Sequence, residues 1–306
     1  MNVGILCSNT GGIEHQQLAK AFSSIGITPF FLDPANLSMG VNLEHSFFHP
    51  KIRVDEMDGF LIRGIGISLL NRCFFRFDLL HALETRGYRL INSAMATERS
   101  FNKSITSIML DANSIPTPST VIAEDLKHAI AAFDRLGGDV LVKPVYGSQG
   151  VGMFRLQERG HAERVLMELY QLGSVFYLQE FLESASPPGE DIANPCDARL
   201  FMVGTECIAA MIRESASPST WKANVHAGGT PRSFNPPREA VDLAIKAAST
   251  MSVELAGIDM IYSRESDDWT VIEVNSCPGW TGLSTVSDVD VPRAVAMYYH
   301  SQLGDG

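Results

Sequence analysis

The chain has 306 residues, of which 45% are apolar and 19% charged; its 24 Lys and Arg against 35 Asp and Glu leave a net charge of −11. This composition supports substantial hydrophobic cores in about two or three domains, and it excludes long disorder, collagen and a disulfide miniprotein. The acidic balance argues against general nucleic-acid binding, which needs a basic face. Local binding of an anion stays open.

The five cysteines are scattered along the chain and form no C-x-x-C pair. This pattern favours mostly buried thiols in a reducing cytoplasm over a disulfide framework. The first residues, MNVGILCSNTGG, contain no basic leader followed by an apolar stretch of signal-peptide length. No apolar run reaches the roughly 18 residues that a membrane span needs. We therefore expect a cytoplasmic protein without a membrane partner.

The N-terminal third alternates strand-like and helix-like runs. Val3–Cys7 is predicted as a buried strand, and apolar spacing over His15–Ile25 predicts a helix that ends at Gly26. Further elements are expected at Pro29–Leu32 (strand), Gly59–Ile62 (strand), Phe74–Arg86 (helix) and Arg89–Ile91 (strand). The alternation predicts a small parallel sheet with helices on its faces.

A second region begins near Thr97 with a predicted helix, Phe101–Leu110, which Pro116 and Pro118 keep from continuing. The elements expected after it are Thr120–Ala123 (strand), Leu126–Leu136 (helix), Val140–Pro144 (strand), His161–Leu172 (helix) and Val175–Phe181 (strand). Residues 184–195 have the composition of a mobile loop. We place domains at 1–95, 96–182 and 183–306.

The third region opens with two β runs, Ala198–Val203 and Cys207–Ile212, and a polar stretch follows as far as Pro237. Apolar spacing predicts an amphipathic helix over Ala240–Leu255. Two strands, Gly257–Ser263 and Trp269–Asn275, and a final helix complete the chain. The whole chain is thus predicted to have an α/β fold.

These last two strands carry an unusual set of polar side chains. The six polar residues between the runs (263–268) favour a hairpin that brings Asp259 near Glu273 and Asn275. Such groups on apolar strands are costly to bury unless something compensates them. Mg²⁺ does so, because it prefers one or two carboxylates together with substrate phosphates. We favour a metal site over a solvated sheet face.

A glycine-rich turn follows the strand that contains Lys143. In LVKPVYGSQGVG, glycines such as Gly147 and Gly150, with Ser148 between them, let backbone N–H groups approach an anion, and Lys143 supplies a point charge. The G-K-[ST] of a Walker A loop is absent, and the turn alone would be an ordinary hairpin. Together with the isolated Lys103 and the acidic strands, it indicates a nucleoside triphosphate site.

Two further segments fit such a site. The run VFYLQEFL (175–182) either enters a domain hinge whose backbone could read adenine or forms an ordinary core strand. After it, Arg199, Arg213 and Lys222 stand at or after the ends of β runs, Lys222 with Asn224 nearby, where they suit either local anion stabilisation or surface ion pairs. His226 is interpreted as a polar loop residue rather than a base.

These motifs, in this order, resemble the RimK-type amino-acid ligases of the ATP-grasp superfamily. The matching segments cover nearly the whole chain: NKSITSIML with IPTPST, VKPVYGSQGVG, LQEFL, DARLFMVG, AAMIRES, WKANVHAGG and GIDMIY…VIEVNSCPGW. The resemblance implies three α/β domains of the ATP-grasp fold. It also implies that ATP and two Mg²⁺ ions, with Mn²⁺ as an alternative, lie between the central and C-terminal domains.

The resemblance further implies a role for each matched residue. The implied roles are phosphate contacts for Lys103 and Lys143, the adenine hinge for Glu180 and Phe181, the ribose for Asp197, the triphosphate for Lys222 and Asn224, and magnesium for Asp259, Glu273 and Asn275. Two departures affect these roles. The connection from Glu180 to Asp197 is longer than usual in the family, and Ala227 stands where the family usually has arginine.

The implied activity is that of an ADP-forming carboxylate–amine ligase. The γ-phosphoryl group of ATP would activate a carboxylate as an acyl phosphate, with Arg213 stabilising the later oxyanion and Lys222 neutralising charge. We expect L-glutamate as the amino acid and a pterin-type coenzyme or peptide-like molecule as the acceptor carboxylate. Arg63 and Arg76 are candidates for recognising an acidic acceptor.

Three alternatives stay open. The first is a ligase of the same fold that modifies a ribosomal protein or an amino-group carrier, and the second is a D-alanine-type ligase. The third is an ATP-binding regulatory protein without turnover, against which the intact Lys143 and acidic strands argue. Assembly as a homo-oligomer is also left open.

Overall fold

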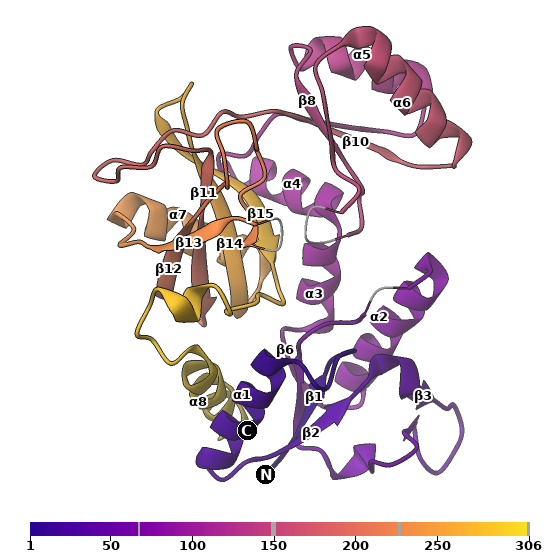
Figure 1. Ribbon diagram of the computed structural model, residues 1–306. Coiled ribbons are helices and arrows are strands. Elements are labelled where there is room, and N and C mark those ends of the chain that lie inside the picture. Colours follow the sequence, from indigo (N-terminus) through magenta and orange to yellow (C-terminus); the bar gives the residue numbers. More distant parts are fainter. Residues whose placement is uncertain (67, 148–150, 226–227, 305–306) are drawn as a thin grey trace.

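The computed structural model describes residues 1–66, 68–147, 151–225 and 228–304. Three main sheets, each with its own helices, form three parts of the molecule (Figure 1). A short two-stranded sheet of β3 (Ser38–Met39) and β4 (Phe47–Phe48) belongs to the first part. The predicted α/β class is confirmed, while the proposed boundaries after residues 95 and 182 stay a prediction.

The first part is built on a parallel sheet with strand order β2-β1-β5-β6. Its elements are β1 (Asn2–Leu6), α1 (Ile13–Ser24), β2 (Thr28–Leu32), β5 (Gly59–Ile62), α2 (Leu70–Thr85) and β6 (Arg89–Ile91). The central strands β1 and β5 are buried along almost their whole length, as expected when both faces of a parallel sheet are covered. The predicted parallel sheet is therefore confirmed.

Two helices lead from the first part to the second, where a single helix Phe101–Leu110 is predicted. They are α3 (Ala94–Phe101) and α4 (Lys103–Ala112). Asn102 separates them with an extended backbone, and its side chain caps α4 by accepting from the amides of Ser104 (3.0 Å) and Ile105 (3.3 Å). The predicted helix Phe101–Leu110 corresponds to α4, which begins two residues later because of this cap, whereas α3 was not predicted.

The second part is a four-stranded antiparallel sheet with order β7-β10-β8-β9. Its elements are β7 (Thr120–Ala123), α5 (Leu126–Arg135), β8 (Val140–Lys143), β9 (Phe154–Leu156), α6 (Arg159–Gln171) and β10 (Phe176–Glu180). The helices α5 and α6 lie together above this sheet in Figure 1 and pack Phe133 and Leu166 into its core. Strand β10 leads from this sheet toward the third part.

The third part is a five-stranded antiparallel sheet with order β13-β12-β11-β14-β15. Its elements are β11 (Cys196–Val203), β12 (Glu206–Glu214), β13 (Thr230–Ser233), α7 (Arg238–Met251), β14 (Leu255–Ser263) and β15 (Asp268–Asn275). The predicted helix Ala240–Leu255 is too long: Ser252 adopts the left-handed conformation (φ 57°) after α7, and Leu255 begins β14. The strand β13, in the polar stretch, was not predicted.

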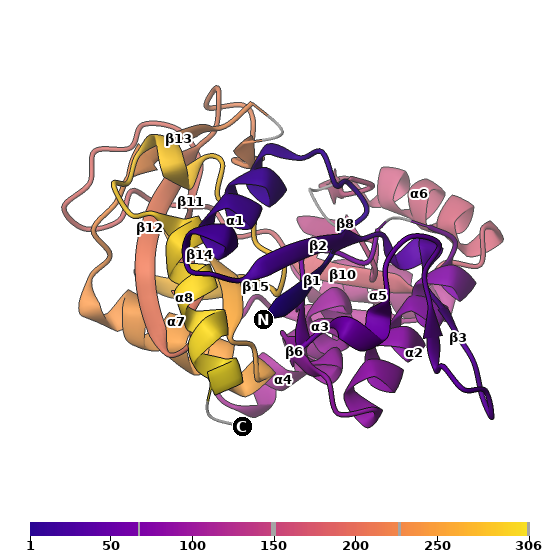
Figure 2. The same ribbon diagram turned by 90° about the horizontal axis from the view of Figure 1, so that it is seen from below.

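The two faces of this third sheet differ sharply. One face packs against small residues of α7, including Ala244 and Ala248. On the other face, Phe201 and Leu255 join a cluster formed with α1 and the last helix, α8 (Val291–Gly304). Figure 2 shows α8 beside α1, so the C-terminal helix returns to the N-terminal part. The rest of that second face is polar and forms the candidate site.

Two expectations from composition can be compared with the fold. All five cysteines are free thiols, of which Cys7, Cys73 and Cys196 are buried. In the parts of the chain that the structure describes, no helix combines the length and apolarity needed to cross a bilayer.

The close contact of α7 with the sheet predicts a steric effect. Ala244 is fully buried there, so Ala244→Leu adds a side chain to a filled interface and should lower the free energy of unfolding by about 1–3 kcal/mol. The matched control, Ser249→Leu on the exposed side of α7, should change it by less than about 0.5 kcal/mol. Urea denaturation measures both, and equal effects would contradict the packing described.

Candidate functional site

Six polar side chains stand on one face of the third sheet, beside the cluster that contacts α1 and α8. They are Asp197 and Arg199 of β11, Arg213 of β12, Asp259 of β14, and Glu273 and Asn275 of β15. The strand register places Arg213 opposite Asp197, and Asp259 between Arg199 and Glu273. The predicted hairpin is therefore confirmed, with Asp259 directly opposite Glu273.

Four of these residues form a buried ionic row, Asp197–Arg213–Asp259–Arg199. Arg213 donates through Nε and Nη2 to the two carboxylate oxygens of Asp197 (2.5 and 2.8 Å), and its Nη2 lies 2.9 Å from Oδ2 of Asp259. Arg199 donates two parallel bonds of 2.7 Å to Asp259. Asp197, Arg213 and Asp259 are buried, so each charge depends on its partners.

The ionic row determines the protonation of its members. Burial opposes the charge on Arg213, but the carboxylates of Asp197 and Asp259 outweigh it and raise the pKa of the guanidinium. For Asp259, burial would raise the pKa, yet Arg199 and Arg213 together bring it below the ordinary value. Burial dominates at Asp197, whose pKa is raised although Arg213 opposes the shift. Asp259 is therefore held as a carboxylate by two arginines.

This pairing bears on the predicted set of three metal ligands, Asp259, Glu273 and Asn275, which stays a prediction. Both oxygens of Asp259 already accept hydrogen bonds from Arg199, and one of them also contacts Arg213. Among the described residues, no group of three or more acidic, histidine or cysteine side chains is arranged to hold an ion. The sequence pattern identifies the face that Asp259 occupies, but not the arginines, which come from strands about 50–60 residues away.

Glu273 and Asn275 fit a magnesium ion better than Asp259 does. The Glu273 carboxylate is half-buried and has no hydrogen-bond partner among the residues that the structure describes. The Oδ1 atom of Asn275 accepts one bond, from the amide of Cys277 at 2.9 Å, and has a second lone pair. One carboxylate and one amide oxygen suit an ion whose other ligands are phosphates and water.

The two predicted phosphate-binding lysines lie near Glu273. Lys143 ends β8 and donates to Oε1 of Gln179, and Lys103 begins α4 and donates to the carbonyl of Gly147 (2.6 Å). The carboxylate of Glu273 acts electrostatically on both. Burial lowers the pKa of Lys103, and it lowers that of Lys143 to about 8, a shift that Glu273 opposes and Lys103 increases.

The turn after β8 is joined to the start of α4, which explains why these lysines are close together. The amide of Lys103 donates to the carbonyl of Val145 (3.1 Å), and Asn102 pairs with Tyr146. The structure thus brings Lys103, Lys143 and Gly147 together, as predicted. Ser148 and Gly150, which we also predicted to contact phosphate, lie outside the described residues, as do His226 and Ala227.

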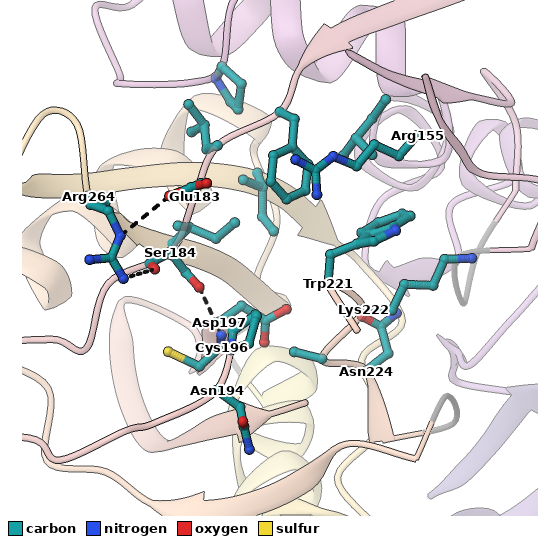
Figure 3. A pocket seen from close by; sticks show the side chains of 18 of the residues that line it. Arg155, Glu183, Ser184, Asn194, Cys196, Asp197, Trp221, Lys222, Asn224 and Arg264 are labelled. Atoms are coloured by element: carbon teal, nitrogen blue, oxygen red, sulfur yellow. Dashed lines mark hydrogen bonds and ion pairs between the residues drawn. The ribbon is translucent and has the colours of Figure 1, made fainter. Parts of the chain in front are cut away.

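A cavity of about 370 Å³ separates the second sheet from the third (Figure 3). Of the predicted site residues, Lys143, Glu180, Phe181, Asp197, Lys222 and Asn224 line it. Apolar groups such as Leu141, Ile261 and Ile272 also contribute to its wall. Its volume and mixture of apolar walls with a few polar groups are typical of a small-molecule site.

Both predicted hinge residues, Glu180 and Phe181, already form hydrogen bonds within the protein. The amide of Phe181 donates to the carbonyl of Asp139 (3.0 Å), and the carboxylate of Glu180 accepts from the amide of Ser119 (2.6 Å). The guanidinium carbon of Arg155 lies 3.4 Å from the centre of the Phe181 ring, in a cation–π contact. An adenine at this edge would therefore meet the Phe181–Arg155 stack, of which sequence reasoning found only the phenylalanine.

The long segment 183–195 covers one side of the cavity. Ser184 accepts a bond from the amide of Cys196 (2.9 Å), and Arg264 contacts both Ser184 and Glu183, as Figure 3 shows. On the opposite wall, Lys222 lies 5.1 Å from the ring centre of Trp221. The sequence indicated the loop but not Arg264 or Trp221, because a lone arginine or tryptophan carries no positional signal.

The prediction that Arg63 and Arg76 recognise an acidic acceptor is wrong. The side chain of Arg63 is only 2% exposed and donates to the carbonyl of Pro278 (2.7 Å). Arg76 is also buried and donates to the carbonyl of Ile65 (2.5 Å). Both guanidiniums bind backbone carbonyls within the protein instead of facing a ligand.

The sequence was then compared with known proteins. The family described as RimK-like ATP-grasp domain matches residues 100–298. The tetrahydromethanopterin:α-L-glutamate ligase of Methanocaldococcus jannaschii is 32% identical to this chain, and the match covers 95% of both proteins. The ligase of the same name from Methanococcus maripaludis is 31% identical, and the match covers 96% of both proteins. The chain belongs to the RimK-like ATP-grasp family. It is accordingly an enzyme, a ligase of that family.

Solved structures agree on the fold of this ATP-grasp enzyme. D-cycloserine synthetase DcsG superposes with a TM-score of 0.75 at 16% identity, covering 99% of this chain and 100% of that one. The ligase PsnB, complexed with minimal precursor, Mg and ADP, gives 0.72 at 16% identity, covering 99% and 97%. ATP-grasp ligases use ATP and Mg²⁺, and the donor set of Glu273 and Asn275 agrees with that use.

The lowered pKa of Lys143 predicts how nucleotide binding depends on pH. Below about pH 8 the lysine is charged in both free and bound protein, so affinity should be constant. At higher pH the free protein loses the proton first, and binding a phosphate must restore it. ADP affinity should therefore fall as pH rises, by up to about tenfold per pH unit.

Calorimetric titration with ADP and Mg²⁺ at several pH values measures this effect. Lys143→Arg is the control, because a guanidinium keeps its charge throughout this range. The variant should bind more weakly near neutrality but show a flatter pH profile. Parallel profiles for the two proteins would show that Lys143 does not titrate with nucleotide binding.

Proposed function

We propose that this enzyme is an ADP-forming ligase that adds L-glutamate to a carboxylate of a pterin-type coenzyme or a peptide-like acceptor. The observation that supports it is the convergence of Lys103, Lys143 and Glu273 beside a cavity of nucleotide size. The helix α4 and the strand β8 supply the two lysines, β15 supplies Glu273, and β11, β12 and β14 supply the adjoining ionic row. Such a mixture of cations and oxygen donors suits a triphosphate with its metal ion.

The reaction begins with transfer of the γ-phosphoryl group of ATP to an oxygen of the acceptor carboxylate, which forms an acyl phosphate and ADP. The glutamate amine then attacks the acyl carbon. The resulting tetrahedral oxyanion collapses, the C–O bond to phosphate breaks, and the amine proton leaves to solvent. The sum is ATP, acceptor and glutamate converted to ADP, phosphate and amide. The protein needs to supply only positioning and charge neutralisation.

The chain's own residues have separate tasks in this scheme. Lys103 and Lys143 hold the phosphates, and Lys222 with Asn224 approaches them from the cavity wall. Glu273 and Asn275 would hold Mg²⁺, which when bound neutralises charge on the transferring phosphoryl group. Asp259 would join them only if its arginines moved, and a second ion would need such a rearrangement.

Arg213 also has a structural task that precedes any catalytic one. Its Nε and Nη2 atoms hold Asp197 and Asp259, which leaves Nη1 as the atom for the predicted stabilisation of the oxyanion. Asp197, although it lines the cavity, has both oxygens on Arg213. A ribose contact by Asp197 would therefore share an oxygen with the guanidinium.

The choice of glutamate and of the acceptor rests on the named relatives. Two of them are tetrahydromethanopterin:α-L-glutamate ligases that match nearly the full length of the chain. The peptide alternative is favoured by PsnB, whose structure contains a precursor. The proposed acceptor is thus a molecule that presents a carboxylate, and the pterin type is favoured over the peptide type.

The proposed function can be tested by a coupled assay of ADP release. The protein, Mg²⁺ and ATP are incubated with glutamate and a panel of acceptors, including pterin coenzymes and peptides ending in glutamate, and products are identified by mass. A product equal to acceptor plus glutamate minus water supports the proposal. ADP release without an acceptor would indicate an ATPase, and formation of a D-alanine dipeptide in a parallel reaction supplied with D-alanine would indicate the D-alanine-type chemistry. No release with any acceptor would favour a regulatory nucleotide-binding protein.

The assignment of Glu273 predicts a specific loss of turnover. Glu273→Gln keeps the size of the side chain but removes the carboxylate charge that would hold Mg²⁺ at the phosphates, so ADP release should fall at least about 100-fold. Glu265→Gln, in the exposed turn of the same hairpin, is the matched control and should retain activity. Normal turnover by the Glu273 variant would contradict the metal assignment.

A further inference from the structure

The segment that follows the proposed metal ligand Asn275 forms several hydrogen bonds with the N-terminal part of the chain. Asn92 donates to the carbonyls of Ser276 (2.8 Å) and Leu255 (2.7 Å), and Cys277 contacts the carbonyl of Ile62. The structure therefore connects two parts of the molecule at the strand end where the proposed magnesium ligands lie.

Glu14, near the start of α1, makes the densest of these contacts. Its Oε1 accepts from the amides of Trp280 (2.7 Å) and Thr281 (2.8 Å) and from the hydroxyl of Thr281 (2.7 Å). These amides follow a turn at Gly279, where an added Cβ would lie only 3.1 Å from Oε1 of Glu14. The carboxylate thus fills the inside of the turn and sets its backbone conformation.

Arg63 completes the arrangement from the end of β5. Its Nη2 contacts Oε2 of Glu14 (3.3 Å) and donates to the carbonyl of Pro278 (2.7 Å), while its guanidinium carbon lies 4.5 Å from the ring centre of Trp280. The remaining Nε and Nη1 atoms are buried without a hydrogen-bond partner among the described residues. Burying the Arg63 guanidinium with two unpaired donors costs free energy of desolvation. We therefore interpret the contacts of Arg63 with Glu14 and Pro278 as having a role beyond packing.

The turn is connected to the candidate site through only a few covalent bonds. Oδ1 of Asn275 accepts from the amide of Cys277 (2.9 Å), and Pro278 follows directly. Gly257, which pairs with Asn275, would place an added Cβ 3.0 Å from Pro278 and 3.4 Å from Nε of Arg199. The turn thus packs closely against the strand residue that pairs with Asn275, so a shift of the turn would displace Asn275.

We propose that Glu14 is a positioning residue for the nucleotide–metal site: by fixing residues 278–281, it orients the Asn275 side chain toward Mg²⁺. The inference rests on the proposed function, because it uses the metal ligands assigned there. Groups that orient metal ligands commonly change metal affinity by about 10–100-fold when removed. The N-terminal part thus contributes to magnesium binding without touching the ion.

The test measures ADP affinity as a function of Mg²⁺ concentration in wild-type protein, Glu14→Ala and Glu14→Gln. Glu14→Ala removes the three hydrogen bonds that the carboxylate accepts from the turn, so it should need about tenfold more Mg²⁺ to reach the tight-binding form. Glu14→Gln keeps an oxygen for the amides but loses the ion pair with Arg63, and its shift should be smaller. ADP affinity without Mg²⁺ should stay unchanged in both.

The matched control is Glu254→Ala. Glu254 forms a different link between the same parts, through Arg89 and the hydroxyl of Tyr298, and its loss should lower stability without changing the Mg²⁺ dependence. Amide hydrogen exchange supplies a readout independent of ligands: Trp280 and Thr281 should exchange faster in Glu14→Ala only. If the Glu14 variants show the Mg²⁺ dependence of the wild type, the proposal is overturned. If Glu14→Ala does not fold, the Mg²⁺ dependence of Glu14→Gln alone tests the proposal.

The two proposals fail in different ways. Normal Mg²⁺-dependent ADP binding without ligation of any acceptor would overturn the proposed function and leave the role of Glu14 intact. ADP binding without Mg²⁺ dependence in the wild type would overturn the role of Glu14, whereas formation of the acceptor–glutamate product in the ligase assay would still support a glutamate ligase.

Discussion

The buried ionic row Asp197–Arg213–Asp259–Arg199 is the constraint around which the site is built. Strands β11, β12 and β14 bring two acids and two bases to one sheet face, where none of them could keep its charge alone. Because the row is internally neutral, it fixes a polar surface without attracting a counterion of its own. Glu273 and the lysines at its edge are then the charges available to a nucleotide and its metal ion.

The same face is polar only where the N-terminal part does not cover it. Phe201 and Leu255, farther along the same strands, are buried against α1 and α8. One sheet face therefore serves two purposes, and the boundary between them is the turn 276–281 that Glu14 and Arg63 hold. In this arrangement the first part of the chain holds the turn that follows β15.

Sequence reasoning succeeded where the information is local. The strands Gly59–Ile62, Arg89–Ile91 and Thr120–Ala123 have the predicted bounds, and the Asp259–Glu273 hairpin was read from alternation and loop length. It missed α3 and placed the start of α4 two residues early, because Asn102 interrupts the helical periodicity and caps α4. It also failed where a partner comes from a distant strand: nothing near Asp259 in the sequence shows that Arg199 and Arg213 hold it.

The central claim is that the phosphates and metal ion of the nucleotide lie between Lys103, Lys143 and Glu273, next to an ionic row that stays intact. A crystal structure of the protein with ADP and Mg²⁺ tests it most directly. The account predicts an ion bound by Glu273, Asn275 and the phosphates, with Asp259 still paired to Arg199. Phosphates bound elsewhere, with these lysines and Glu273 turned away from them, would contradict it.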